Sequence, residues 1–264
     1  MPSVHHAAGL ALAATEMGAK VHLTGAARAG WRAGRAPVAP DDDVLAPDAR
    51  GRPARPELVD PRELRARSVR SVEGRIAAVH AVAHIEANAI DLALDAAHRF
   101  RGLPEAFYDD WLRVAEEEAR HFGLLRDRLA ALGAAYGDLP AHGGLWDACA
   151  RTADDVLRRM ALVPRVLEAR GLDVNPPMIA RFEAAGDHAT AGILREILAD
   201  EVGHVAVGDR WFRWCCEQRG LDPAPTFTRL LAEAGVRVRP PFNVEARLAA
   251  GFSPDELEDL AAPR

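Results

Sequence analysis

The segment WLRVAEEEARHFGLLRDRLAAL, residues 111–132, decides the fold class of this chain of 264 residues. Its apolar residues recur every three or four positions, which places them on one face of an α-helix. Glu118 and His121 fall in the middle of that face, where a helix of a soluble protein usually carries apolar side chains. The full face is Trp111, Val114, Glu118, His121, Leu125, Leu129 and Leu132. We therefore expect a helix that turns a carboxylate and an imidazole toward the core.

The same pair recurs in the segment LREILADEVGHVAVGDRWFRWC, residues 194–215. Glu201 and His204 have the same order and spacing as the first pair, again within an apolar face. That face is Leu194, Ile197, Glu201, His204, Gly208, Trp211 and Cys215. One Glu-x-x-His pair is common by chance, but two pairs in phase with two apolar faces are a specific signal.

Two further predicted helices each carry one glutamate in phase with an apolar face. Glu86 lies on the face formed with Ile76, Val79, Ala83, Ile90 and Leu94, and Glu168 follows Leu157, Ala161 and Pro164. Glu86 precedes Glu118 by 32 residues, and Glu168 precedes Glu201 by 33, so the pattern occurs twice in the same order.

On the predicted helix that carries Glu168, the sequence offers more than one candidate ligand. Pro164 stands one turn before Glu168 and predicts a kink, because proline lacks the backbone donor that an α-helix needs. The kink would aim Glu168, open a cavity, or show that the assumed register is wrong. Asp154 and Asp155 are the alternative ligands on this helix, and we favour Glu168.

Four carboxylates on core faces would destabilise an apolar core by several kcal/mol and would repel one another. Two divalent cations remove both costs, and oxygen and imidazole ligands suit iron or manganese. A Glu from each of two helices with Glu-x-x-His from two others is the ligand pattern of di-iron and di-manganese bundles. We predict two Fe ions, or an Fe/Mn or Mn/Mn pair. The predicted metal and catalytic residues are Glu86, Glu118, His121, Glu168, Glu201 and His204.

An alternative interpretation is a bundle with salt-bridged polar residues in its core, which would require arginines on the same faces; the sequence places none there. Each Glu-x-x-His pair also follows another acid, Glu117 or Asp200. Because a metal-bound histidine usually donates its other N–H to a carboxylate, we expect Glu117 to serve His204 and Asp200 to serve His121. Solvent-facing charges explain these two acids equally well.

No tyrosine stands one turn after either histidine, where Leu125 and Gly208 are found instead. This disfavours a tyrosyl-radical role. We expect Gly208 to leave space beside the metals for oxygen or substrate.

The order of helices predicts an all-α protein with extended ends. Six prolines between Arg35 and Pro61, beside the acidic run Asp41–Asp43, predict an arm with no regular element. Caps and glycine stops predict helices over 7–20, 71–101, 105–132, 145–169, 175–186 and 187–219, an extended stretch over 236–242 and a last helix from Ser253. The predicted domains are residues 1–67, an N-terminal helix and Pro-rich arm packing on the core; 68–220, a four-helix bundle; and 221–264, a C-terminal tail.

Composition excludes several classes of protein. The chain lacks an apolar run long enough to span a membrane, and its three cysteines form no C-x-x-C pair. Residues 7–14 make a poor signal peptide, so we expect a cytoplasmic protein. A net charge of −6 gives no indication of nucleic-acid binding, although four of the acids are assigned to the core and the surface is correspondingly less acidic.

Several segments carry a resemblance to known proteins: His84-Ile85-Glu86, Glu116–His121, Leu167–Asp173, Asp200–His204 and Arg210–Trp214. The chain resembles the ferritin-like di-iron superfamily, and more closely a bacterial ferritin-like family of unknown function (domain of unknown function 455). The resemblance extends from about Ala36 to Phe252. That family is similar to the di-iron tRNA hydroxylase of methylthio-isopentenyl-adenosine, which also carries Glu-Ala-Arg-Gly on its third helix. The resemblance implies a ferritin-like four-helix di-iron core and oxygen-dependent oxidation.

We therefore expect an O₂-dependent oxygenase, hydroxylase or oxidase of an organic substrate. Its partners would be a small-molecule substrate, O₂ and an electron donor, and its oligomeric state stays open between monomer and dimer. The alternatives are a ferroxidase or iron-handling protein, a tRNA-modifying hydroxylase, and a helical interaction module with an inactive site. The long arm and tail fit the shell of an iron-storage cage poorly.

Overall fold

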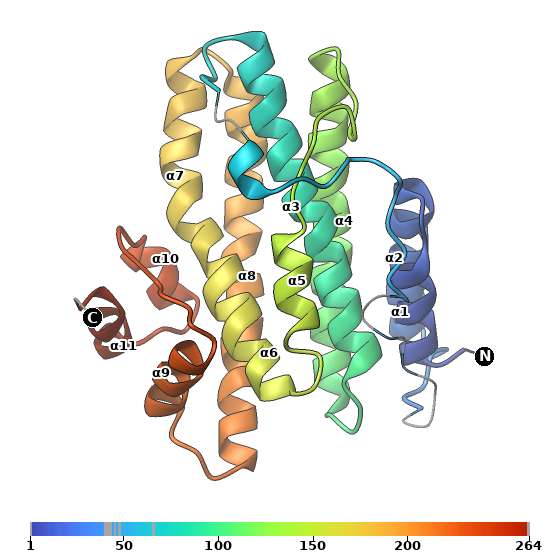
Figure 1. Ribbon diagram of the computed structural model, residues 1–264. Coiled ribbons are helices and arrows are strands. Elements are labelled where there is room, and N and C mark those ends of the chain that lie inside the picture. Colours follow the sequence, from blue (N-terminus) through green and yellow to red (C-terminus); the bar gives the residue numbers. More distant parts are fainter. Residues whose placement is uncertain (1, 40–43, 45, 47–48, 65–66, 263–264) are drawn as a thin grey trace. The chain divides into compact units, whose positions relative to one another are not determined.

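The computed structural model describes residues 2–39, 44, 46, 49–64 and 67–262, and within these ranges it contains helices and no β-strand (Figure 1). The predicted all-α class is confirmed. The chain divides into two compact units, Met1–Ala150 and Arg151–Arg264. The predicted boundaries at residues 67 and 220 stay a prediction, and Asp41–Asp43 lie outside the described residues. None of the described helices is both long and apolar enough to cross a bilayer.

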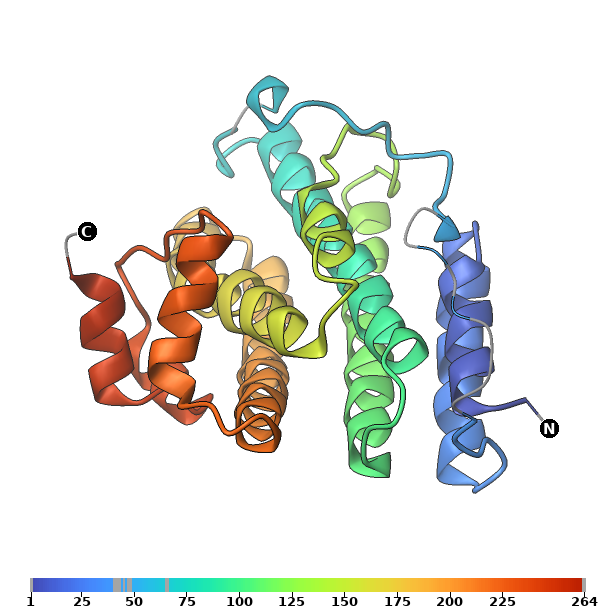
Figure 2. The same cartoon turned by 60° about the horizontal axis from the view of Figure 1, so that its bottom comes forward.

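The first unit is built on two long helices, α3 (Val72–Arg99) and α4 (Glu105–Ala131), which pack against each other. Ser71 caps α3 as predicted, because its hydroxyl accepts a hydrogen bond from the Gly74 N–H. Figure 2 shows α1 (Val4–Ala13) and α2 (Met17–Arg32) along one side of this pair, and α5 (Gly144–Ala150) packs on α3. A short 3₁₀ turn, Pro61–Glu63, lies in the arm.

The single helix predicted over residues 7–20 is wrong, since the chain breaks between α1 and α2. The buried ammonium of Lys20 donates 3.0 Å to the carbonyl of Leu12, near the end of α1, and contacts Asp91 of α3 at 2.5 Å. The break turns α2 back so that Lys20 meets the end of α1, which the sequence pattern did not indicate. The Gly51 N–H also donates to Leu12, so the described part of the arm lies against this unit.

The second unit is built on α8 (His188–Gln218), whose N-cap Asp187 accepts from the Thr190 N–H. Along α8 lies a continuous helical run formed by α6 (Val156–Leu162), the π-helix η3 (Val163–Glu168) and α7 (Ala169–Ala184) (Figure 1). The unit is completed by α9 (Pro223–Glu233), α10 (Val244–Ala249) and α11 (Pro254–Ala261). The helix expected from Ser253 is confirmed and carries a capping box with Glu256, whereas α9 and α10 were not predicted.

The helices predicted over 145–169 and 175–186 are wrong in their limits. The chain is not helical between α5 and α6, and α7 then continues through Gly171 and through Pro176 and Pro177. Pro176 has no N–H for the carbonyl of Leu172, and the side-chain amide of Asn243 donates to that carbonyl instead, at 3.2 Å. The missing donor is therefore supplied from a position 71 residues away in the sequence.

Candidate metal centre

Three predicted ligands come together in the first unit. Glu86 comes from α3, and Glu118 and His121 come from successive turns of α4. His121 Nδ1 lies 3.2 Å from Glu118 Oε2 and 3.5 Å from Glu86 Oε2. One ligand atom from each of the three residues lies within 4.8 Å of the others. The exposed fractions are 3 %, 1 % and 0 % for Glu86, Glu118 and His121, so this is an interior cluster.

The two carboxylates control the charge of His121. Burial disfavours the imidazolium, but hydrogen bonds and charge interactions from Glu118 and Glu86 outweigh burial and raise the pKa of His121 to about 10. Its other nitrogen, Nε2, lies 3.3 Å from Nη2 of Arg120. The nitrogen that faces the carboxylates, Nδ1, is therefore the one that can share a cation with them.

A buried cluster of two carboxylates and one imidazole could hold a metal ion. A proton on His121 offsets one of the two negative charges, whereas a divalent cation offsets both and leaves the imidazole neutral as a ligand. The donor set contains oxygen and nitrogen and no thiolate, since Cys149, Cys215 and Cys216 are separate buried free thiols.

The second predicted pair lies on α8 in the second unit. His204 Nδ1 lies 3.8 Å from Glu201 Oε1, one helical turn away. His204 is fully buried and Glu201 is 8 % exposed, although both are polar. The Glu-x-x-His spacing thus produces in this unit the same acid–imidazole neighbourhood as Glu118 and His121 produce in the other.

Glu168 is the last residue of the π-helix and is half-buried. The expected kink at Pro164 takes the form of this wider turn, which starts where proline withholds a backbone donor. The alternative ligands are engaged elsewhere: Asp154 pairs with Arg158 at 2.9 Å, and Asp155 caps α6 and pairs with Arg219. Glu168 therefore stays the better candidate on this segment.

The two acids expected to support the histidines have different surroundings. Glu117 is half-buried and forms an ion pair with Arg113, one turn earlier on α4, at 2.9 Å. Asp200 is also half-buried. Their proposed hydrogen bonds to His204 and His121 stay predictions.

The expectation that Gly208 leaves space for oxygen or substrate is wrong. A β-carbon added at Gly208 would stand 2.1 Å from Cβ and 2.3 Å from Cγ of Pro164. The proline ring therefore already occupies the space beside this glycine. Gly208 allows the π-helix to approach α8, rather than opening a channel along α8.

A further buried polar cluster, centred on Arg165, was not predicted from the sequence. Its guanidinium is fully buried and lies 2.6 Å from Glu256 and 3.2 Å from Asp209. It also stacks within 4.1–4.7 Å of three aromatic ring centroids, those of Phe212, Phe227 and Phe252. No local pattern could have indicated this cluster, because Glu256 is 91 residues away.

Comparison with known proteins places the chain among relatives that have no assigned activity. A family described as "Protein of unknown function (DUF455)" matches residues 13–258. An "Uncharacterized protein" of Haemophilus influenzae is 45% identical over 229 residues, which make up 84% of this chain and 78% of that protein. No solved structure matches the chain.

Proposed function

We propose a function for this chain, which belongs to the DUF455 family, from the chemistry of its own buried ligands. In this proposal it is a di-iron carboxylate protein of ferritin-like type that uses O₂ to oxidise an organic substrate. Fe/Mn and Mn/Mn are the alternative metal pairs. The family match agrees with the resemblance drawn from the sequence; the ferritin-like kinship, the metals and the reaction are the proposal.

The observation that carries the proposal is the cluster of Glu86, Glu118 and His121. The two carboxylates are buried beside the imidazole of His121, with ligand atoms within 4.8 Å of one another. An interior of this kind is stabilised when a divalent cation takes the place of the proton on His121. The local geometry thus favours a metal over a purely structural hydrogen-bond network.

The second half of the proposed site is drawn from the second unit. Glu201 and His204 repeat the acid–imidazole pair on α8, and Glu168 ends the π-helix that packs on the same helix. The six ligands predicted from the sequence amount to four carboxylates and two imidazoles, the complement that two divalent ions neutralise. π-Helical turns inside α-helices often occur at functional sites, which supports Glu168 as the ligand of this segment.

When bound, two ferrous ions would supply the electrons that activate O₂, and O₂ would be the oxidant of the substrate. The protein's own residues then have three tasks. The glutamates would hold the ions and offset their positive charge. His121 gives up its proton when its Nδ1 becomes a ligand. The buried surroundings of both histidines exclude water from the site.

The test is loading with ferrous iron in the absence of oxygen, followed by exposure to O₂, with absorption and Mössbauer spectroscopy as readouts. We expect the spectrum of a coupled pair of ferric ions in the wild-type protein. Glu118→Ala should abolish the coupled signal, and Glu116→Ala, an exposed acid on the same helix, should leave it intact. Uncoupled ferric iron alone in the wild type would contradict a two-iron centre.

A substrate-dependent increase in O₂ consumption separates oxidation of an organic substrate from iron handling. The proposed oxygenase consumes O₂ faster when a substrate and an electron donor are present. A ferroxidase instead consumes O₂ in proportion to added ferrous iron and continues beyond two irons per chain. Screening small molecules and modified tRNA nucleosides in the same assay tests the class of substrate.

A further inference from the structure

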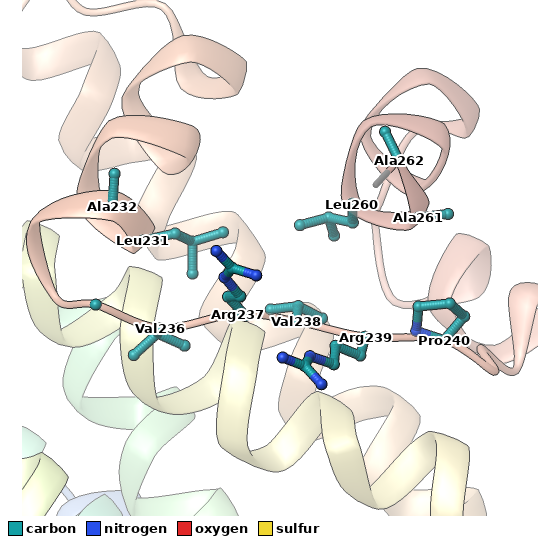
Figure 3. Close-up of a pocket in the computed structure, with 11 residues that line it drawn as sticks. Leu231, Ala232, Val236, Arg237, Val238, Arg239, Pro240, Leu260, Ala261 and Ala262 are labelled. Carbon is teal, nitrogen blue, oxygen red and sulfur yellow. The ribbon is translucent and has the colours of Figure 1, made fainter. Parts of the chain in front are cut away.

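The C-terminal part of the second unit contains a groove of about 800 Å³ (Figure 3). Leu231 at the end of α9 and Leu260 at the end of α11 point toward each other across it, and Val236–Pro240 runs along its base as an extended segment. The walls are therefore aliphatic. The groove is unrelated to the candidate metal ligands, none of which lines it.

The groove has a positive charge that its surroundings do not neutralise. Arg237 and Arg239 are exposed and form no ion pair or hydrogen bond with the described part of the chain. Of the described residues that line the groove, none is acidic. The nearby Glu233 pairs with Arg229 on its own helix at 2.7 Å. This contrasts with Arg165, Arg213, Arg219 and Arg247 of the same unit, which all pair with carboxylates.

The backbone of the same segment is also available. Val236 donates to the carbonyl of Leu231 at the end of α9, and the next described backbone donor with a partner is Asn243, which donates to Asp173. The N–H groups of Arg237, Val238 and Arg239 form no hydrogen bond with described residues. An extended segment with unpaired backbone groups can accept another extended chain beside it.

We propose that this groove binds an extended acidic peptide segment of a partner protein. Its backbone would pair with the free backbone groups of Arg237–Arg239, and its carboxylates would pair with the side chains of Arg237 and Arg239. Its aliphatic side chains would fill the space between Leu231 and Leu260. Backbone pairing supplies affinity in such complexes, while the charges and the aliphatic walls select the sequence. The free backbone donors favour a peptide over a nucleic acid or a lipid headgroup, neither of which adds a strand.

The test uses the full chain and a fluorescein-labelled peptide, Gly-Leu-Asp-Leu-Asp-Leu-Asp-Gly, with fluorescence anisotropy as the readout. We expect saturable binding that weakens by about tenfold or more when asparagine replaces aspartate in the peptide. The double variant R237E/R239E should lose binding by a similar factor, and it should instead bind the corresponding lysine peptide. R181E is the matched control, because Arg181 is an exposed arginine of α7 outside the groove, and its affinity should stay unchanged.

Two further measurements distinguish the peptide from other occupants. Two peptides, each methylated on one of the two alternating sets of amide nitrogens, should differ. The set that faces the segment should weaken binding by about tenfold, because its methylation removes the backbone donors needed for strand pairing. Unchanged binding of both methylated peptides overturns the proposal. A second result would also overturn it: the protein does not bind the peptide but binds a single-stranded oligonucleotide or phosphatidylglycerol vesicles, and R237E/R239E abolishes that binding.

Discussion

The two units each bury a polar cluster, and the clusters differ in what neutralises their acids. In the second unit, Asp209 and Glu256 receive two guanidinium groups, from Arg165 and Arg213, at 2.6–3.2 Å. In the first unit, Glu86 and Glu118 both lie beside Nδ1 of His121, at 3.5 and 3.2 Å. The first arrangement is a permanent ion-pair network, while the second can exchange its proton for a metal. In the proposed function, the Arg165 cluster belongs to the folded framework, whereas the His121 cluster is the one that would accept a metal ion.

The largest expected effect is on the Arg165 cluster. Arg165→Ala leaves Asp209 and Glu256 buried with one cationic partner fewer, and it should lower the free energy of unfolding by about 3–5 kcal/mol. Urea unfolding without metal measures the loss. Arg229→Ala, which removes an exposed pair with Glu233, should cost less than about 1 kcal/mol. Equal losses for the two variants would remove the distinction between the clusters.

Metal binding at the cluster around His121 should stabilise the protein, whereas loss of Arg165 destabilises it. Ferrous or manganous ion should raise the unfolding temperature, and the stabilisation reaches about 2.7 kcal/mol at a free metal concentration of 100 times Kd. Glu118→Gln should remove this increase in unfolding temperature. Without metal, it should cost less stability than Arg165→Ala, because it replaces a buried charge with a neutral group of the same shape. Thermal unfolding with and without metal, under anaerobic conditions, checks both parts. A metal response that survives in Glu118→Gln would contradict the assignment of this ligand.

The contact between the π-helix and α8 gives a smaller effect. Gly208→Ala places a methyl group 2.1 Å from Pro164 Cβ and should destabilise the protein by about 1–3 kcal/mol. Because the π-helix must then move, metal occupancy should fall as well if Glu168 is a ligand. Gly203→Ala is the control on the same helix, since no atom lies within 4 Å of its added carbon and alanine favours a helix. Unchanged occupancy in a folded Gly208→Ala protein would argue against Glu168.

The last expected effect concerns the pH dependence of stabilisation by the metal. The pKa of His121 is raised to about 10, so in the metal-free protein its imidazolium contributes stability that is complete below the unfolded value of about 6.5 and is lost as pH rises through about 10. The metal replaces this proton, so its stabilising effect should grow as pH rises from about 6 to 9. The difference in unfolding temperature between loaded and metal-free protein measures this trend. A pH-independent difference would show that metal binding does not involve His121.

The sequence was sufficient where structure is local. Helical periodicity and the expected helix starts at Ser71 and Asp187 predicted α3, α4 and α8. The in-phase pattern on α3 and α4 predicted that Glu86, Glu118 and His121 lie together. The sequence was insufficient where a contact with a distant residue overrides a local preference, such as the tendency of proline to end a helix. Pro176 stays inside α7 because Asn243 supplies the missing hydrogen-bond donor.

Contacts between distant residues also explain why the role of Gly208 was predicted wrongly and why the burial of Arg165 was not predicted. Gly208 suggested open space, but the ring that fills this space belongs to Pro164 on another segment. Arg165 has the sequence context of a surface arginine, and its burial follows from three aromatic rings and two acids that only the folded chain assembles. Charged residues in the core could therefore be predicted only where they lie in phase with the apolar face of their own helix.

The most direct measurement is the number of metal ions per chain, determined by elemental analysis after anaerobic loading with ferrous iron and removal of free metal. The proposed di-iron centre predicts about two irons per wild-type chain. Glu118→Ala should lose at least one of them, and Glu116→Ala should keep both. Fewer than about 0.2 metal ions per folded wild-type chain would contradict the central claim that the buried acids and histidines form a metal centre.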